Sequence, residues 1–398
     1  MEIIVDHQWI RRLFPPLTAL GTASTPVECP VTVVVLARDE ERCLARCLDS
    51  AVGRGFDEIL VVDTGSVDKT LDIVEEYARQ GVRLVRCPWT DSFADVRNFA
   101  IETVGAGWIV FLDADEWLDE GSADRLRACL TSLSAIPDLD RMVFSPIIQH
   151  VDRDGFLDDV ARIFKAESGI RYRGAVHEYP ALSGKPVNMA GLDLLFHHDG
   201  YDAAVIDGKD KRGRNLRLLG AAMEAEPDSP RWVYFMIRDA LPLLEHAQLL
   251  ELCETLRDLV RREPVTDDRL DARHYYRRAL GVACQGFAAM GDWATLHRYC
   301  DDLDRLDGHD NPDAHYFRSV AELLNGVATQ SDLLLTMRIR RDEKLVETSA
   351  VDKAGGHLDA LLAELLNRVK GESDGDRYRG MCEPWTDVFF ERSILRRW

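Results

Sequence analysis

Three carboxylates within four residues end an apolar stretch of this sequence. The run GWIVFLDADEW, residues 107–117, reads as a buried strand that stops at Asp113, Ala114, Asp115 and Glu116. Carboxylates this close repel one another and raise one another's pKa unless positive charge lies between them. Because hard divalent cations bind carboxylate oxygens, one interpretation is a cation site. The alternative is a solvated acidic strand end, and the motif alone does not decide between the two.

Residues farther along the chain supply further candidate chemistry. His177 and Glu178 follow Gly174 in a segment that reads as strand and loop, where Glu178 is either a general base or a partner that orients His177. A lone histidine is more often a core or surface residue than a ligand. A basic cluster in this acidic chain either begins a solvated helix or neutralises a departing diphosphate; it contains Lys209, Lys211, Arg212 and Arg214.

The elements that would position these residues alternate between strand and helix signals. Apolar residues at helical spacing predict a helix after each of the first three strands. Continuous apolar strands joined by such helices predict a mainly parallel sheet that is covered on both faces. The predicted strands are 31–37, 58–63, 82–86 and 107–113.

The carboxyl ends of these strands are acidic. Asp39, Asp63 and Asp113 lie at or just after such ends, where ligands of parallel sheets gather. A glycine-rich phosphate loop is absent from the sequence, which argues against dinucleotide oxidoreductases and P-loop enzymes. We therefore expect phosphates to be held through a metal. Asp63 either accepts hydrogen bonds from a base or ribose, or caps the turn that follows it.

Taken together, these motifs resemble the family 2 glycosyltransferases of GT-A fold over roughly residues 31–120. The resemblance implies that Asp113 and Asp115 form a DxD motif, which holds Mg²⁺ or Mn²⁺ on the diphosphate of a nucleotide-sugar. It also implies that Asp63 recognises the base, that Ala37, Asp39 and Glu40 line the nucleoside, and that Arg97 and Asn98 lie near the donor. The motifs are VTVVVLARDEERCLARCLDSA, EILVVDTGSVDKT, DSFADVRNFA and VFLDADEW.

Later segments narrow the resemblance to the sublancin-type peptide S-glycosyltransferases. These segments are residues 161–180, which include Arg162, residues 196–201, FHHDGY, and residues 209–241. The resemblance implies an inverting transfer from a UDP-hexose, with UDP-glucose the expected donor, to a Cys or Ser of a precursor peptide. Its implied site residues are Asp115, His177 and His198 for the metal, Glu178 and Asp115 for catalysis, and Arg162, Lys209, Lys211 and Arg214 for the nucleotide-sugar.

Two alternative functions remain open at this point. Helical-repeat tails also occur in family 2 enzymes that build surface glycans, so a polysaccharide or lipid-linked acceptor is the first alternative. The second is a TPR-type binding protein with an inactive GT-A domain, against which the intact DxD motif argues. Genomic context, or an assay of a Cys-bearing peptide against a glycan acceptor, would separate the two enzymatic readings.

Composition limits the classes of partner. The chain has 398 residues, 46% of them hydrophobic, and a formal net charge of −20, which argues against nonspecific binding to nucleic acid or anionic membrane. The amino terminus does not read as a signal peptide, and no apolar run is long enough to span a membrane. The nine cysteines are scattered without zinc-site spacing. We expect a cytoplasmic protein.

From about residue 206 the strand signals stop and amphipathic helices follow. We expect residues 1–30 to form an extension, 31–205 the GT-A domain, 206–370 an all-α, TPR-like domain, and 371–398 a tail that docks on the array or on a second subunit. Two helices are predicted to turn at Gly291 and Asp292, as in tetratricopeptide arrays. Such arrays bind peptides or form homodimers. Residues 372–380 are expected to be a polar loop.

Overall fold

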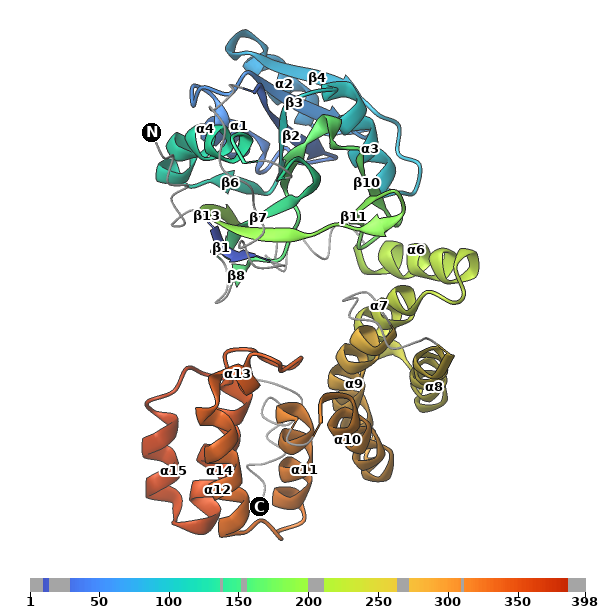
Figure 1. Cartoon of the computed structure of the whole chain (residues 1–398), viewed down its shortest axis with the longest axis vertical. Helices are drawn as coiled ribbons and strands as arrows, with labels where there is room; N and C mark the ends of the chain where they lie inside the picture. The colour runs from blue at the N-terminus through green and yellow to red at the C-terminus, as the bar shows by residue number, and fades with distance from the viewer. Residues whose placement is uncertain are drawn as a thin grey trace. The chain divides into compact units, whose positions relative to one another are not determined.

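The computed structural model describes residues 10–13, 29–136, 139–151, 156–199, 211–262, 272–308 and 311–385. The chain divides into two compact units, residues 1–218 and 219–398. The first contains a mixed sheet with flanking helices, and the second contains helices (Figure 1). The predicted fold class, a mainly parallel GT-A-type sheet followed by an all-α region, is confirmed.

One half of the large sheet consists of four parallel strands in the predicted places, with β4 at the edge. Their order is β5 (Trp108–Asp113), β2 (Val31–Ala37), β3 (Glu58–Asp63) and β4 (Val82–Arg86). Gly107 immediately precedes β5 with a φ of +89°, and a Cβ there would lie 2.4 Å from the carbonyl oxygen of Pro30. Only glycine fits this close approach of two chain segments.

Helices cover both faces of these strands. Two separate buried clusters share the sheet between them. The first cluster takes apolar residues from α1 (Leu44–Ala51), α2 (Thr70–Tyr77) and α4 (Glu120–Ser134). The second takes them from α3 (Phe93–Val104) and from the strand β10 (Ile170–Arg173). This burial accounts for the continuous apolar strands.

Beyond β5 the sheet continues with strands of both directions. The order from its far edge is β1 (Ile10–Leu13), β13 (Met189–His198), β7 (Val143–His150) and β9 (Ile163–Lys165). β9 runs antiparallel to β5, whereas β7 and β13 run parallel to each other. β6 (Glu116–Leu118) pairs with β13, and β8 (Phe156–Leu157) pairs with β7. A small second sheet contains β10, β11 (Tyr179–Leu182) and β12 (Lys185–Pro186). β1 comes from the segment that we expected to be an extension.

The described chain after residue 210 is helical. Asp292 caps α10 by accepting a hydrogen bond from the Thr295 N–H at 3.1 Å, and Gly291 has a φ of +76°, so the predicted turn is confirmed. No helix among the described residues is long and apolar enough to cross a membrane. The helices are α6 (Lys211–Ala225), α7 (Pro230–Ala240), α8 (His246–Arg262), α9 (Ala272–Ala289), α10 (Trp293–Asp307), α11 (Pro312–Leu324), α12 (Gln330–Arg341), α13 (Glu343–Val346), α14 (Gly356–Val369) and α15 (Glu372–Arg379).

The loop prediction for residues 372–380 is wrong, because this segment forms α15. Its charges pair at helical spacing: Arg379 contacts Asp376 at 2.5 Å and Glu364 of α14 at 2.6 Å. A polar sequence therefore forms a helix by packing on α14 and by pairing charges three residues apart. Trp385 packs its ring 5.9 Å from that of His357 in α14, whereas the other aromatic residues of the predicted tail, Phe389 and Phe390, lie outside the described residues.

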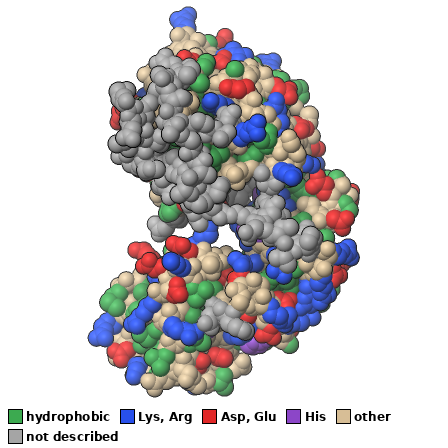
Figure 2. Space-filling model, in the orientation of Figure 1, with side chains coloured by type: hydrophobic (Ala, Val, Ile, Leu, Met, Phe, Trp, Pro, Cys, Tyr) green, Lys and Arg blue, Asp and Glu red, His purple; other side chains and the backbone are tan. Residues whose placement is uncertain are grey.

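The described surface carries charges of both signs. On the face drawn in Figure 2, acidic and basic side chains both occur. Local charge, more than the net charge of −20, therefore decides where an anion could bind.

Candidate active site

Arginines hold two of the three carboxylates that end β5. Arg162, which precedes β9, places Nη2 2.5 Å from Asp113 Oδ2 and 2.6 Å from Glu116 Oε1. Arg97 of α3 donates from Nη2 to the other Asp113 oxygen at 3.2 Å. The Asp113 N–H also donates to Glu116 Oε2 at 3.1 Å. The positive charge that the sequence pattern requires between Asp113 and Glu116 is thus provided by arginine side chains.

The pKa values of Asp113 and Glu116 shift in opposite directions in this environment. Burial alone would raise the pKa of Asp113, but the charges of Arg162 and Arg97 outweigh burial and hold that pKa well below its usual range. Burial raises the pKa of Glu116, to which the charge of Asp113 adds, although Arg162 opposes the shift. Asp113 therefore stays ionised, and Glu116 is the acid of the pair that accepts a proton more readily.

Arg97 links the DxD segment to Glu178. Its Nε donates to Glu178 Oε1 at 2.8 Å, and the Arg97 side chain is only 7% exposed. The guanidinium lies 5.0 Å from the ring centre of Phe111 and 5.3 Å from that of Tyr172, within cation–π range. The structure therefore brings together three predicted site residues, Arg97, Asp113 and Glu178, in one connected network.

Asn98, which neighbours Arg97, has a structural partner. Its side-chain amide donates to the Tyr172 carbonyl at 2.9 Å and accepts from the Tyr172 N–H at 2.8 Å. The amide N–H and the amide oxygen of Asn98 thus both join α3 to β10. The structure gives Asn98 a part in the fold, and its predicted contact with the donor stays a prediction.

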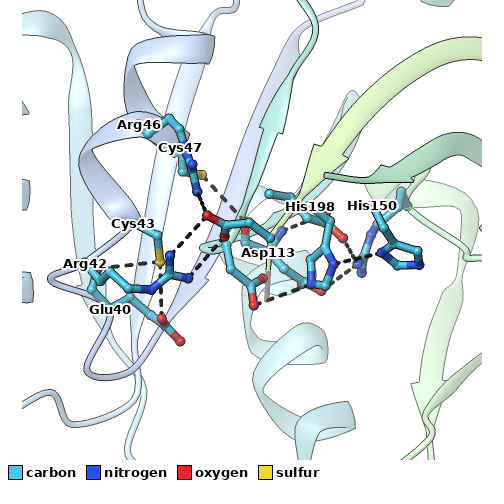
Figure 3. A network of polar contacts seen from close by, with 12 residues as sticks. Glu40, Arg42, Cys43, Arg46, Cys47, Asp113, His150 and His198 are labelled. Atoms are coloured by element: carbon cyan, nitrogen blue, oxygen red, sulfur yellow. Dashed lines mark hydrogen bonds and ion pairs between the residues drawn. The ribbon is translucent and has the colours of Figure 1, made fainter. Parts of the chain in front are cut away.

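Asp115, the second acid of the motif, lies beside His198, which in turn contacts His150 of the neighbouring strand. His198 of β13 places Nε2 3.6 Å from Asp115 Oδ2. Its Nδ1 lies 3.2 Å from Nδ1 of His150, which ends β7 opposite His198. Burial lowers the pKa of His198, but the hydrogen bond and charge of Asp115 outweigh burial, so this pKa is raised. Figure 3 shows the two imidazoles side by side near Asp113.

Asp115 and His198 are a chemically suitable pair of donors for a divalent cation, because Mg²⁺ and Mn²⁺ take carboxylate oxygens and Mn²⁺ also takes imidazole. Among the described residues, no group of three or more His, Cys, Asp or Glu side chains is arranged to hold a metal. His177, a predicted ligand, therefore does not complete such a group; it lies next to Glu178 with a φ of +50°. The other ligands would be phosphate oxygens and water.

The turn that carries Asp115 is tied to the first helix. Asp199, next to His198, donates its N–H to the Asp115 carbonyl at 3.3 Å. Its carboxylate accepts two hydrogen bonds from Arg42, each 3.1 Å, and one from Arg46 at 2.5 Å (Figure 3). The guanidinium of Arg46 also lies over Trp117, 3.8 Å from its ring centre. These contacts fix the position of Asp115 relative to α1.

The residues expected to line the nucleoside lie in two interlocked loops. The N–H of Glu40 donates to the Thr70 hydroxyl at 2.7 Å, and Asp39 accepts from the Val67 N–H at 2.8 Å. The carbonyl of Ala37 accepts from the Thr64 N–H at 3.0 Å. Asp39 has a φ of +55°. The two loops therefore form one rigid edge after β2 and β3.

Asp63 lies under this edge as a turn residue. Its two carboxylate oxygens accept from the N–H groups of Gly65 and Ser66, at 3.1 and 3.0 Å, and the residue is 3% exposed. This is the turn interpretation that the sequence left open. Recognition of a base by Asp63 stays a prediction.

The described part of the basic cluster lies near the start of α3. Arg214 of α6 has its guanidinium 5.0 Å from the ring centre of Phe93. Arg217, one helical turn later, makes two hydrogen bonds of 3.1 and 2.9 Å to Asp91. Lys211 begins α6, and Lys209 lies outside the described residues.

Sequence reasoning missed His150 and the Arg42–Asp199 contact. The signal for His150 was weak, because it is one histidine at the end of an apolar run, 48 positions before His198. Only the pairing of β7 with β13 places the two rings together. Arg42 and Asp199 are 157 positions apart, and nothing in their local sequence indicates a contact.

Comparisons with known proteins agree with the motifs of residues 31–120. Residues 32–144 match the sequence model of glycosyl transferase family 2. The chain is 25% identical over 367 residues to the SPbeta prophage-derived glycosyltransferase SunS of Bacillus subtilis, covering 88% of this chain and 82% of that protein. It is 28% identical over 305 residues to a TPR repeat-containing protein of Synechococcus elongatus, covering 68% of this chain and 71% of that one. It is also 33% identical over 111 residues to the lipopolysaccharide core biosynthesis glycosyltransferase LpsC of Rhizobium meliloti, covering 27% and 38%. The matched segment, residues 32–144, spans the acidic end of β5, so this part of the chain is a family 2 glycosyltransferase domain.

Proposed function

We propose that this glycosyltransferase is inverting and metal-dependent, and that it moves a hexose from a UDP-sugar, with UDP-glucose as donor, to a Cys or Ser of a ribosomal precursor peptide. The observation that carries the proposal is the pairing of Asp115 with His198 at the ends of β5 and β13. The resemblance of residues 161–180, 196–201 and 209–241 to the sublancin-type peptide S-glycosyltransferases supports the peptide acceptor.

Asp115 and His198 would hold the cation in this proposal. A bound Mg²⁺ or Mn²⁺ supplies positive charge to the diphosphate as it leaves the sugar. Asp113 plays a different part: its oxygens accept from Arg97 and Arg162, so it keeps these two cationic groups and the strand end in place. Arg162 and Arg97 then contribute a fixed positive field behind the donor site.

The donor nucleotide is proposed to lie along the edge after β2 and β3. Ala37, Asp39 and Glu40 line it, with Asp63 bracing the turn beneath. Lys209, Lys211 and Arg214 are proposed to face the phosphates, where their charges would offset that of the leaving diphosphate. Arg214 is the member of this set whose position beside Phe93 supports the assignment.

Glu178 is proposed to take the proton of the acceptor. Arg97 orients its carboxylate through Oε1, which leaves the second oxygen for the proton. The acceptor then attacks the anomeric carbon from the face opposite the departing diphosphate, which inverts its configuration. A cysteine thiol has an ordinary pKa near 8.5, so it needs less help from a base than a hydroxyl does.

The domain division remains part of the proposal. Residues 31–205 would carry the chemistry, and residues 206–370 would recognise the acceptor peptide or form a homodimer. The extension 1–30 and the tail 371–398 would complete the two parts. The nine cysteines are all free thiols, which supports a reducing cytoplasm as the place of action. We propose no nucleic-acid partner.

A glycan is the second candidate acceptor. The likeness to LpsC, whose name describes lipopolysaccharide core biosynthesis, favours it. That likeness spans 27% of this chain, whereas the likeness to SunS spans 88% and includes helical residues. The peptide acceptor therefore stands first.

The test is a transfer assay with a panel of nucleotide-sugars and Mg²⁺ or Mn²⁺. Three peptides of one sequence would carry Cys, Ser or Ala at the acceptor position, beside a glycan acceptor, with products identified by mass spectrometry. Asp115→Asn is expected to lower transfer by about 10² to 10³, as is removal of the metal with EDTA. The matched control is Asp119→Asn, because Asp119 lies just after β6, as Asp115 lies just before it, and is 3.7 Å from His197; asparagine preserves its helix cap.

Four outcomes distinguish between the candidate acceptors and test the roles proposed for Asp115 and Glu178. Transfer to the Cys and Ser peptides but not to the Ala peptide supports the peptide acceptor. Transfer to the glycan alone replaces it with the second candidate. Undiminished activity of Asp115→Asn would mean that the Asp115–His198 pair does not serve the donor. A fall in Glu178→Gln transfer that is larger for Ser than for Cys identifies Glu178 as the base.

A further inference from the structure

His150 is a buried ring that none of the roles above uses. It is 5% exposed, it ends β7, and it lies directly opposite His198 in the parallel pairing with β13. The two Nδ1 atoms are 3.2 Å apart, and the rings meet nearly edge to face with centres 5.3 Å apart. The other nitrogen of His198 is the one that faces Asp115.

The short contact restricts where protons can be. When both rings are neutral, one Nδ1 must carry the hydrogen and the other must accept it, because two lone pairs or two N–H groups at 3.2 Å repel. A metal-binding imidazole nitrogen must present a lone pair. For His198 to use Nε2, its hydrogen must therefore be on Nδ1, where His150 Nδ1 accepts it.

We propose that His150 is a positioning residue that holds His198 as the Nδ1–H tautomer and turns its Nε2 lone pair toward the cation beside Asp115. This inference rests on the proposed metal-dependent function. His150 touches neither the cation nor the substrate. It acts through the orientation of His198, as carboxylates and carbonyls commonly do for metal-bound histidines.

The neighbouring histidine provides a contrast within the same strand. His197 is packed against Trp117, with ring centres 5.3 Å apart, and lies 3.7 Å from Asp119. Successive residues of a strand point to opposite faces, so His197 faces away from the Asp115 side. It gives a matched control that changes a histidine of β13 without touching the proposed pair.

The test measures Mn²⁺ binding to the full chain by electron paramagnetic resonance, with UDP present and without any turnover. His150→Leu removes the acceptor and keeps an apolar volume, so its dissociation constant for Mn²⁺ should rise about 10- to 100-fold. His150→Asn places an amide oxygen near the former Nδ1 and should restore most of the affinity. His198→Ala should lose the site, whereas His197→Asn should bind as the unchanged protein does. Thermal unfolding of each variant checks that it is folded.

The outcomes separate a failure of this inference from a failure of the proposed function. An unchanged protein that binds no Mn²⁺ with UDP overturns the proposed metal-dependent function and this inference with it. If the unchanged protein binds Mn²⁺ and His150→Leu binds it with the same affinity, this inference alone is overturned. It is also overturned if His150→Leu and His150→Asn weaken Mn²⁺ binding equally. If His150→Leu does not fold, the tautomer is read directly in the unchanged protein with Mg²⁺ and UDP by nitrogen-15 NMR of labelled histidines. A hydrogen on Nε2 of His198 would then contradict the proposal.

Discussion

Two aspartates, the half-buried Asp113 of the sheet unit and the buried Asp313 of the helical unit, have opposite kinds of partner. Asp113 in the sheet unit lies between Arg162 and Arg97, and its pKa is held low. Asp313 in the helical unit is fully buried and accepts from the Ser349 hydroxyl at 2.5 Å and the Ala350 N–H at 2.7 Å. Burial raises the pKa of Asp313, and these neutral donors do not offset it.

The comparison contrasts the partners of one aspartate in each unit. The sheet unit preserves negative charge by surrounding it with arginine, which keeps a charged and rigid strand end beside the donor site. The helical unit hydrogen-bonds its acid to uncharged groups, which suits a residue that joins helices. The same side chain is thus part of a functional site in one unit and of a packed core in the other.

The largest expected effect follows from removing Arg162, the arginine that Asp113 and Glu116 share. Arg162→Met would leave the buried Glu116 beside Asp113 without their shared cation, at a cost of about 3–5 kcal/mol in unfolding free energy. The difference from the unchanged protein should shrink as pH falls, because protonation of the two acids removes their repulsion. Denaturant unfolding of the sheet unit at several pH values measures both effects.

The control for Arg162→Met is Arg54→Met, which removes an exposed arginine paired with Asp124 and Glu120. We expect little change from it, since exposed ion pairs contribute little. Equal denaturation midpoints for the two variants would contradict the role given to Arg162.

The next effect concerns acid sensitivity of the helical unit. Burial lowers the pKa of His357 to about 4, and Asp352 and Asp359 only partly oppose this shift. An unfolded histidine has a pKa near 6.5, so the stability that the neutral ring contributes is complete above pH 6.5. It is lost as pH falls from 6.5 toward 4, by on the order of 3 kcal/mol. The raised pKa of Asp313 acts in the opposite direction at the acid end of this range.

Hydrogen exchange of α11 and α14, corrected for intrinsic rates, measures this loss. In His357→Leu the change in protection between pH 7 and pH 5 should largely disappear. A slope that persists unchanged in this variant would assign the acid sensitivity to another group.

The smallest effects come from helix caps, one in each unit. Ser92 caps α3 by accepting from the Asp95 N–H at an exposed position, and Ser92→Ala should cost about 1 kcal/mol. Asn311 caps α11 from a buried position and also donates to Asp307. Asn311→Ala should therefore cost more, about 2 kcal/mol. Thermal or denaturant unfolding ranks the pair, and a larger cost for Ser92→Ala would reverse the comparison.

The parts of the fold that follow local patterns could be predicted from the sequence. The strand prediction for residues 31–37 corresponds to β2 at both ends, because β-branched residues and a flanking turn define it. The family also followed from local motifs. The polar segment of α15 was mistaken for a loop because its helix depends on packing against α14, which no local pattern reveals.

The contacts within the candidate site depend on long-range strand pairing. The sequence indicated Asp113 and Asp115 because ligands gather at strand ends, but it did not indicate which residues contact them. The antiparallel insertion of β9 beside β5 places Arg162 at Asp113, and the register of β7 with β13 places His150 at His198. Register across the sheet is set by the whole core and cannot be read from either segment alone.

The buried ion network also has a consequence for the order of synthesis. Asp113 and Glu116 leave the ribosome 46 to 49 residues before Arg162, and Arg97 precedes Glu178 by 81 residues. At about 5–20 residues per second, the growing chain carries these acids without Arg162 for roughly 2–10 seconds. The four parallel strands that carry this acidic end are already synthesised by then. The site therefore closes in two later steps, first when β9 arrives and then when the segment that carries Glu178 arrives.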